Sequence, residues 1–216
     1  MKYDLVIFDM DGTVLDTLGD LTAALNHTLR GQGFPEHTRD EVKSYIGNGV
    51  KMLLKRGAPE GTDDKTLAEM YKTYAEYYFS HLDVSTKPYD GITELLHKLG
   101  DCGVKRALLS NKTDMAARSL CEEFFPGLFD IAHGEREGVP RKPAPDGVFE
   151  ILREIGIPAE RTLYVGDSGV DLETARRAGL NCVIVDWGYL NSEVTLNEGR
   201  EFSVSSTDEI ERIIFE

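Results

Sequence analysis

Several features that mark other protein classes are scarce in this sequence. Only three cysteines occur among 216 residues, at positions 102, 121 and 182, and no CxxC pair is present. This argues against a disulfide framework and against a cysteine zinc site. The start, MKYDLVIFDMDG, has too short an apolar run for a signal peptide, and no stretch approaches the length of a membrane span. We therefore expect a soluble, cytoplasmic protein with reduced thiols and no membrane partner.

Basic residues are also in the minority. Lys and Arg number 24 against 38 Asp and Glu, which gives a formal net charge of −14. Nucleic acids and anionic membranes need a basic face, so neither is an expected partner. A small anionic substrate stays possible, because it needs only a locally positive pocket or a bound cation. The composition fits a monomer or a homodimer and does not choose between them.

Short apolar runs alternate with helical patterns. The runs predict strands that are covered on both faces, at residues 5–8, 107–109, 163–165 and 182–185, and more weakly at 129–131. Helical spacing of apolar residues predicts helices over 91–100, 145–156 and 169–178, and a further helix after Ser206, which has capping-box spacing to Glu209. The alternation predicts a doubly wound, mostly parallel α/β sheet of the Rossmann-like type.

The segment from about 17 to 87 breaks this rhythm, because it contains no convincing strand. It carries a helical stripe of leucines from Leu18 to Leu29, with Thr17 and Asp20 as a possible helix cap. We predict a helical cap domain over 17–87, inserted into an α/β core formed by 1–16 and 88–216. The connections near 15–18 and 82–89 would be paired hinge strands. Four tyrosines at 71, 74, 77 and 78 are more typical of helix packing than of a ligand-stacking box.

Polar side chains follow the predicted strands. Asp9 and Asp11 come directly after the first strand in the sequence DMDGT, where Gly12 permits a sharp turn. Two carboxylates at a strand end are costly unless they meet a cation or differ in protonation.

Further candidates stand at other strand-to-helix junctions. They comprise a hydroxyl, an amide, a lysine and two acids: Ser110, Asn111, Lys142, Asp167 and Asp171. Each has a plain structural explanation alone, such as a helix cap or a solvated charge. A parallel sheet brings such junctions to one rim, so together they predict a single site.

This order of motifs resembles the haloacid dehalogenase-like superfamily of phosphohydrolases. The resemblance spans nearly the whole chain and rests on four motifs: DMDGT at 9–13, LLSN at 108–111, RKPAPD at 141–146 and GDSGVD at 166–171. The inserted helices resemble the cap that many family members carry at this point. The second carboxylate, Asp11, argues against the dehalogenases themselves, which lack it.

The resemblance implies a role for each matching residue. Asp9 would be the nucleophile that forms an aspartyl-phosphate, and Asp11 the general acid and then the base. Mg²⁺ would be held by Asp9, Asp167 and the main-chain carbonyl of Asp11. Ser110, the backbone at Asn111 and Lys142 would bind the phosphoryl group. Gly12, Thr13 and Asp171 would support the site, with Asp171 orienting Lys142 or a metal-bound water.

The predicted cap carries the sequence IGNG at 46–49 before a short helix. Backbone NH groups at a helix start can bind a carboxylate or phosphate, so Gly47, Asn48, Gly49 and Lys51 are candidate substrate residues. An ordinary interhelical turn explains the same residues. This segment also resembles the cap of phosphoglycolate phosphatases within the superfamily.

The resemblance therefore implies a Mg²⁺-dependent phosphatase for a small phosphorylated metabolite, with 2-phosphoglycolate as first candidate. Alternatives with the same chemistry are an inorganic pyrophosphatase and a sugar-phosphate mutase. A phospho-accepting receiver domain is an alternative from another class, because it also joins an acidic Mg²⁺ site to a Ser or Thr and a Lys. The helical insertion argues against it, since receivers have no cap.

Overall fold

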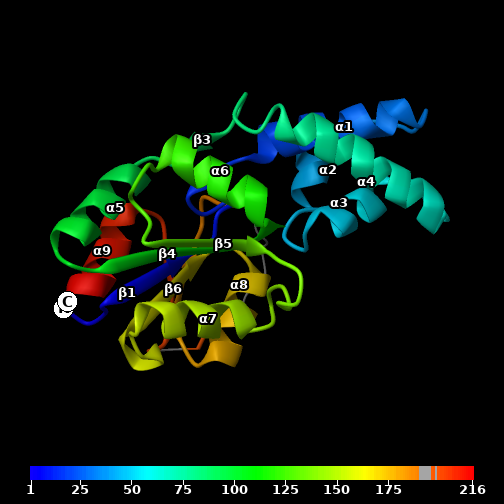
Figure 1. Ribbon diagram of the computed structural model, residues 1–216. Helices are drawn as coiled ribbons and strands as arrows, with labels where there is room; N and C mark the ends of the chain where they lie inside the picture. The colour runs from blue at the N-terminus through cyan, green and yellow to red at the C-terminus, as the bar shows by residue number, and fades with distance from the viewer. Residues whose placement is uncertain (190–195, 198) are drawn as a thin grey trace.

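Six parallel strands form the central sheet. The computed structural model describes residues 1–189, 196–197 and 199–216 (Figure 1). The strands are β1 (Leu5–Phe8), β4 (Lys105–Thr113), β5 (Ile131–Glu135), β6 (Thr162–Gly166), β7 (Asn181–Val185) and β8 (Glu201–Val204). Their order is β5-β4-β1-β6-β7-β8, and every neighbouring pair runs parallel. The predicted parallel α/β sheet is therefore confirmed.

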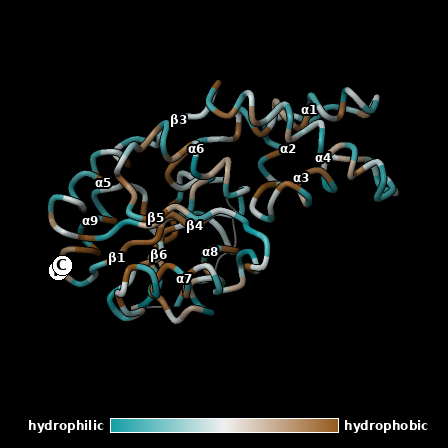
Figure 2. Tube along the Cα trace, in the orientation of Figure 1, coloured by the Kyte–Doolittle hydropathy of each residue, from teal (hydrophilic) through white to brown (hydrophobic). Residues whose placement is uncertain are grey.

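Helices cover both faces of this sheet. Alternate residues of β1 point to opposite sides: Val6 and Phe8 pack with α5 (Ile92–Asp101), α6 (Asp114–Phe124) and α9 (Thr207–Phe215). Leu5 and Ile7 pack with α7 (Asp146–Ile155) and α8 (Gly169–Ala178) on the other side. Figure 2 shows the hydrophobic colour concentrated along the central strands between these layers. A short 3₁₀ helix, η1 (Ala159–Arg161), precedes β6.

Four helices lie beyond one end of the sheet (Figure 1): α1 (Leu18–Gly31), α2 (Arg39–Lys43), α3 (Val50–Gly57) and α4 (Asp64–Phe79). They surround an apolar cluster that is separate from the two sheet clusters. Two short strands flank them, β2 (Leu15–Asp16) and β3 (Lys87–Pro88), which pair antiparallel. The inserted helical cap is thus present. Its exact division from the core after residues 16 and 87 stays a prediction.

The expected helix caps at Thr17 and Ser206 are wrong in their chemistry, although both residues are N-caps. Neither side chain accepts a cap hydrogen bond. The Thr17 hydroxyl donates to Asp11 Oδ1 instead, at 2.6 Å. Glu209 accepts from the backbone NH of Ser205 rather than from that of Ser206. Thr17 thus bonds to the turn after β1, and Glu209 bonds one residue ahead of the N-cap.

Asp20 also differs from expectation, since its carboxylate bonds to the chain segment before β3 instead of capping α1. This buried carboxylate accepts hydrogen bonds from the NH groups of Ser85 and Thr86 and from the Thr86 hydroxyl, all between 2.7 and 3.0 Å. It therefore links the start of α1 to the chain segment that leads into β3.

Two strand boundaries were misjudged and one strand was missed. The run at 107–109 extends through Ser110, Asn111 and Lys112, and the weak strand at 129–131 lies at Ile131–Glu135. β8 was not predicted, because its sequence EFSV contains only two apolar residues, Phe202 and Val204. All three cysteines are free, as expected. Within the described part of the chain, no helix has both the length and the apolarity to cross a membrane.

Glu201, at the start of β8, is a buried acid that accepts several hydrogen bonds. Its carboxylate accepts from Arg176 of α8 through two nitrogens at 2.8 Å and from the NH of Asn197 at 2.6 Å. The Arg176 hydrogen bonds, against the opposing effect of burial, lower the pKa of Glu201 to about 2. Because this pKa is lowered on folding, the stabilisation is present above the ordinary pKa and is lost as the pH falls toward 2.

We expect Glu201→Gln to lower the free energy of unfolding by about 2 kcal/mol at pH 7. The difference from wild type should shrink by about 1 kcal/mol at pH 3.5, where the wild-type advantage is partly titrated away. Urea unfolding at the two pH values measures this. Glu173→Gln is the matched control, because its Arg177 partner is half-exposed and such pairs contribute little. An equal loss at both pH values would contradict the assignment.

Candidate active site

Asp9 is the first residue beyond the carboxyl end of β1. Its backbone NH donates to the carbonyl of Val165, at 2.8 Å, so the register of β1 with β6 fixes its position. The side chain is nearly buried and lines a cavity between the sheet end and the inserted helices. The parallel sheet thus places this carboxylate at the rim where open α/β folds bind ligands.

A tight turn follows Asp9. The NH groups of Thr13, Val14 and Leu15 all point at the carbonyl of Met10, at 3.0–3.2 Å. Gly12 has a positive φ of 85°, and a Cβ at this position would lie 2.3 Å from Asp167 Oδ2. Glycine is therefore required at position 12 for two reasons: the backbone conformation and the close approach of Asp167.

Asp11 is held by groups that the motif analysis did not connect to it. Its Oδ1 accepts from the Thr17 hydroxyl at 2.6 Å, and it forms an ion pair with Lys112 Nζ at 3.0 Å. Lys112 also donates to the hydroxyl of Tyr78 on α4, at 2.7 Å. Asp11 therefore lies where the sheet meets the inserted helices.

Lys142 is buried between two acids. Its Nζ lies 2.7 Å from Asp9 Oδ1 and 2.7 Å from Asp171 Oδ1, and it donates to the Tyr164 hydroxyl at 3.2 Å. Burial alone would lower the pKa of Lys142, but the Asp171 and Asp9 carboxylates raise it well above its usual value. Lys142 therefore remains an ammonium ion.

Negative charge exceeds positive charge here. Asp9, Asp167 and Asp171 each offer a carboxylate oxygen, and these three oxygens lie within 4.8 Å of one another. Burial, and then the charge of Asp171, raise the pKa of Asp9 to about 7. The same two causes raise the pKa of Asp167. A cation would remove this excess.

The oxygens that a cation would meet can be identified. Both Asp171 oxygens are occupied, by Lys142 and Tyr164 on one side and by the Ser168 NH and hydroxyl on the other. Asp9 and Asp167 each use one oxygen, Asp167 accepting from the Tyr189 NH at 2.7 Å. Their other oxygens accept no hydrogen bond from the described residues. This donor set fits Mg²⁺, which prefers few carboxylates and retained waters.

Ser110 and Asn111 sit inside β4 rather than beyond it, yet both line the cavity. The Asn111 side chain is fully engaged: its amide donates to the carbonyls of Gly47 and Lys142, and its oxygen accepts from the Lys142 NH. Asn111 therefore joins β4, the loop before α7 and the turn before α3. The Ser110 hydroxyl accepts from the Lys112 NH at 3.2 Å and keeps its own proton for a ligand.

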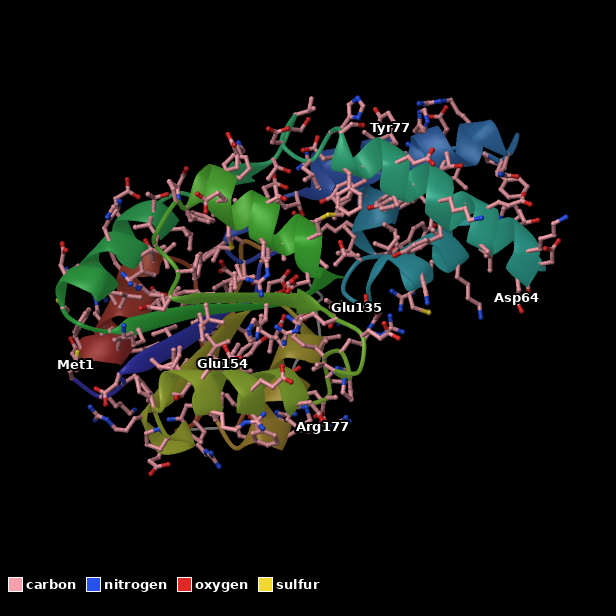
Figure 3. All side chains as sticks on the ribbon, viewed as in Figure 1. Met1, Asp64, Tyr77, Glu135, Glu154 and Arg177 are labelled. Atoms are coloured by element: carbon pink, nitrogen blue, oxygen red, sulfur yellow. The ribbon has the colours of Figure 1, made fainter. Side chains whose placement is uncertain are left out.

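The four candidates in the inserted helices separate into two pairs. Gly47 and Gly49 line the cavity, whereas Lys51 is exposed and Asn48 uses its side-chain oxygen to accept from Arg56. Lys51 and Asn48 are absent from the described lining. The turn rests on the sheet end, with Gly49 close to Glu135, which Figure 3 labels near the end of β5.

Lys112 and Tyr164 were missed as functional candidates, and Tyr189 was not connected with Asp167. Lys112 directly follows Asn111. It would have been placed at the site if β4 had been predicted to extend beyond Ser110. Tyr189 donates through its NH to Asp167, and its hydroxyl accepts from the Thr17 NH. The buried Thr13 hydroxyl has no hydrogen-bond partner among the described residues.

The fold and the acidic cluster together define a class. The sequence model of the haloacid dehalogenase-like hydrolases matches residues 6–185, which span the strand before Asp9 through β7. The chain belongs to this family.

Its relatives identify it more narrowly as a phosphatase. The phosphoglycolate phosphatase of Aquifex aeolicus (strain VF5) is 34% identical over 193 residues, 88% of this chain and 89% of that protein. A phosphoglycolate phosphatase of Pseudomonas syringae pv. tomato is 31% identical over 97% of this chain and 78% of its own length. A crystal structure from Lactobacillus delbrueckii subsp. bulgaricus, provisionally named phosphoglycolate phosphatase, superposes with a TM-score of 0.91 at 34% identity and 99% coverage of both chains.

We expect Gly12→Ala to lower phosphatase activity at least ~100-fold, because the added Cβ displaces the Asp167 carboxylate. Gly33→Ala is the matched control: φ is also positive, at 71°, but no atom lies within 4 Å of the added Cβ. That variant should lose only ~1 kcal/mol of stability and keep its activity. Turnover of p-nitrophenyl phosphate and thermal unfolding of both variants measure this. Full activity in folded Gly12→Ala would contradict the proposed contact.

Proposed function

We propose that this protein is a Mg²⁺-dependent phosphatase that hydrolyses 2-phosphoglycolate through an aspartyl-phosphate on Asp9. The observation that carries the proposal is the state of the Asp9 carboxylate. One oxygen is fixed by Lys142 at 2.7 Å, and the other faces the cavity without a hydrogen bond from any described residue. A positioned, partly neutralised carboxylate is suited to nucleophilic attack on phosphorus.

In the first half-reaction Asp9 attacks phosphorus through one carboxylate oxygen, and the bond from phosphorus to the ester oxygen breaks. Asp11 gives its proton to that leaving oxygen, which requires Asp11 to be protonated when substrate is bound. Ser110 donates its hydroxyl proton to a phosphoryl oxygen. The positive charge of Lys142 reduces the repulsion between the Asp9 carboxylate and the phosphate.

In the second half-reaction water attacks the same phosphorus. Asp11, now a carboxylate, takes the proton of that water, and the bond from phosphorus to Asp9 breaks. Inorganic phosphate leaves and Asp9 regains its carboxylate. Thr17 and Lys112 hold Asp11 Oδ1 in the structure, so its second oxygen is the one that we assign to proton transfer.

Mg²⁺ would be held by Asp9, Asp167 and the main-chain carbonyl of Asp11, and it would neutralise charge on the phosphoryl oxygens. Asp171 would serve by fixing Lys142, since its own oxygens are already occupied.

The cavity favours a small substrate. Its volume is about 100 Å³, and its walls combine charged side chains at the sheet end with apolar ones from the inserted helices. The names of the relatives point to 2-phosphoglycolate. Inorganic pyrophosphate and sugar phosphates are the competing substrates. The family membership and the inserted helices favour an enzyme over a receiver domain.

We expect Asp11→Asn to lower steady-state turnover by ~10²-fold or more, since it removes the acid and the base. The nitrophenolate leaving group needs no proton, so this variant should release about one equivalent of it in a burst and then stall as phosphoenzyme. Rapid-mixing kinetics and intact-mass detection of the added phosphate measure this. Asp9→Asn should show neither burst nor turnover, while the exposed Asp101→Asn serves as the control. A burst from Asp9→Asn would remove Asp9 as the nucleophile.

A panel of substrates tests the reaction itself. With Mg²⁺, kcat/KM for 2-phosphoglycolate should exceed that for pyrophosphate and for sugar phosphates at least tenfold, with no isomerised sugar phosphate formed. EDTA should abolish phosphate release, because the excess negative charge of the site then has no counter-ion. Added Mg²⁺ should restore phosphate release. Preference for pyrophosphate, or an isomerised product, would replace the proposal with one of those activities.

A further inference from the structure

The cavity contains a buried hydroxyl without a partner. Tyr74 of α4 lines the cavity and is 1% exposed as a residue, and its hydroxyl makes no hydrogen bond in the described structure. Leaving such a group unpaired in the interior is unfavourable. Every other tyrosine hydroxyl that is buried to this degree near the site has a partner: those of Tyr78, Tyr164 and Tyr189 are all bonded. The Tyr74 hydroxyl is therefore available to a ligand.

The tyrosines of α4 lie on two sides of the helix. Tyr71, Tyr74 and Tyr78 line the cavity, and the rings of Tyr74 and Tyr78 stack at 5.4 Å. Tyr77 lies on the other side of the helix, toward the outer edge of the molecule in Figure 3, where it stacks with His27 and His81. The core-packing interpretation of all four tyrosines was therefore incomplete, since three of them also form a cavity wall.

A buried cation stands beside this wall. Lys112 Nζ is within 2.7 Å of the Tyr78 hydroxyl and 3.0 Å of Asp11 Oδ1, and its side chain is 3% exposed. Unlike Lys142, which two carboxylates and Tyr164 surround, Lys112 has one carboxylate partner among the described residues. Its ammonium group has three N–H donors, of which Asp11 and Tyr78 take two, so one is left for a substrate.

We propose that Lys112 and the Tyr74 hydroxyl form a subsite for a carboxylate on the leaving group, which makes the enzyme selective for phosphate esters of short 2-hydroxy acids. The distance from Asp11 to Lys112 limits how far the carboxylate can lie from the ester oxygen. Asp11 protonates the ester oxygen, and Lys112 is one hydrogen bond from Asp11. A carboxylate one carbon beyond the ester oxygen would therefore reach Lys112, whereas one at the far end of a long chain would not fit the small cavity. This proposal rests on the proposed function.

The test compares two substrates of similar size, 2-phosphoglycolate and 2-hydroxyethyl phosphate, which has a hydroxyl in place of the carboxylate. Wild type should prefer 2-phosphoglycolate. Lys112→Met should slow both reactions, because Lys112 contacts Asp11, but the ratio of the two kcat/KM values should fall at least tenfold. Tyr74→Phe should lower the same ratio about threefold, chiefly through KM for 2-phosphoglycolate, without loss of thermal stability, because it removes only an unpaired hydroxyl.

Two further variants separate the possible outcomes. Lys55→Met, at an exposed position of α3, should leave the ratio unchanged, and Lys43→Met tests the other lysine that lines the cavity. An equal loss on both substrates in Lys112→Met would overturn the subsite and leave Lys112 as a positioning residue for Asp11. Collapse of the ratio in Lys43→Met alone would also overturn it. If wild type hydrolysed neither ester with Mg²⁺, the proposed function itself would fail.

Discussion

The placement of one ammonium group between two carboxylates governs the architecture of the active site. Lys142 is 2.7 Å from both Asp9 and Asp171, and all three side chains are almost without solvent contact. Buried charges are tolerated only when they are paired and hydrogen-bonded, so the loop that carries Lys142 must be held closely to the sheet. Asn111 does this by bonding both the NH and the carbonyl of Lys142. Asp167 then adds a negative charge that no described cation balances, which is why this rim fits a divalent ion.

Much of this arrangement follows from sequence. Asp9, Ser110 and Asp167 each belong to an apolar run of strand type or follow it directly, and a parallel sheet leaves them no other place than one rim. Ser168 as an N-cap also placed Asp171 in the first turn of α8, and the family resemblance offered Lys142 or a metal-bound water as its partner. These predictions rest on local patterns and on a topology that has few alternatives.

The contacts that were missed have a different origin. Lys112, Tyr74 and Tyr78 meet through packing of α4 against the end of β4, and nothing in the local sequence of either segment encodes that contact. The apolar run ended before Ser110, and Lys112 was not considered as a site residue. The caps at Thr17 and Asp20 failed similarly, because both side chains bond to segments that are near in space, at Asp11 and at Ser85–Thr86. Tertiary partners thus overrode local capping preferences.

The paired linkers restrict how the inserted helices can be displaced. Two short strands, β2 and β3, run antiparallel, and Asp20 fastens the second linker to the first turn of α1. A body tethered by two adjacent strands can rock about the line between them but cannot rotate freely. Such rocking would separate Gly47 from Asn111 and Tyr78 from Lys112. Thr17, which lies at the pivot, would keep its bond to Asp11. Such a movement would therefore open the cavity at the sheet end without moving the Asp11 carboxylate, because Thr17 still holds it.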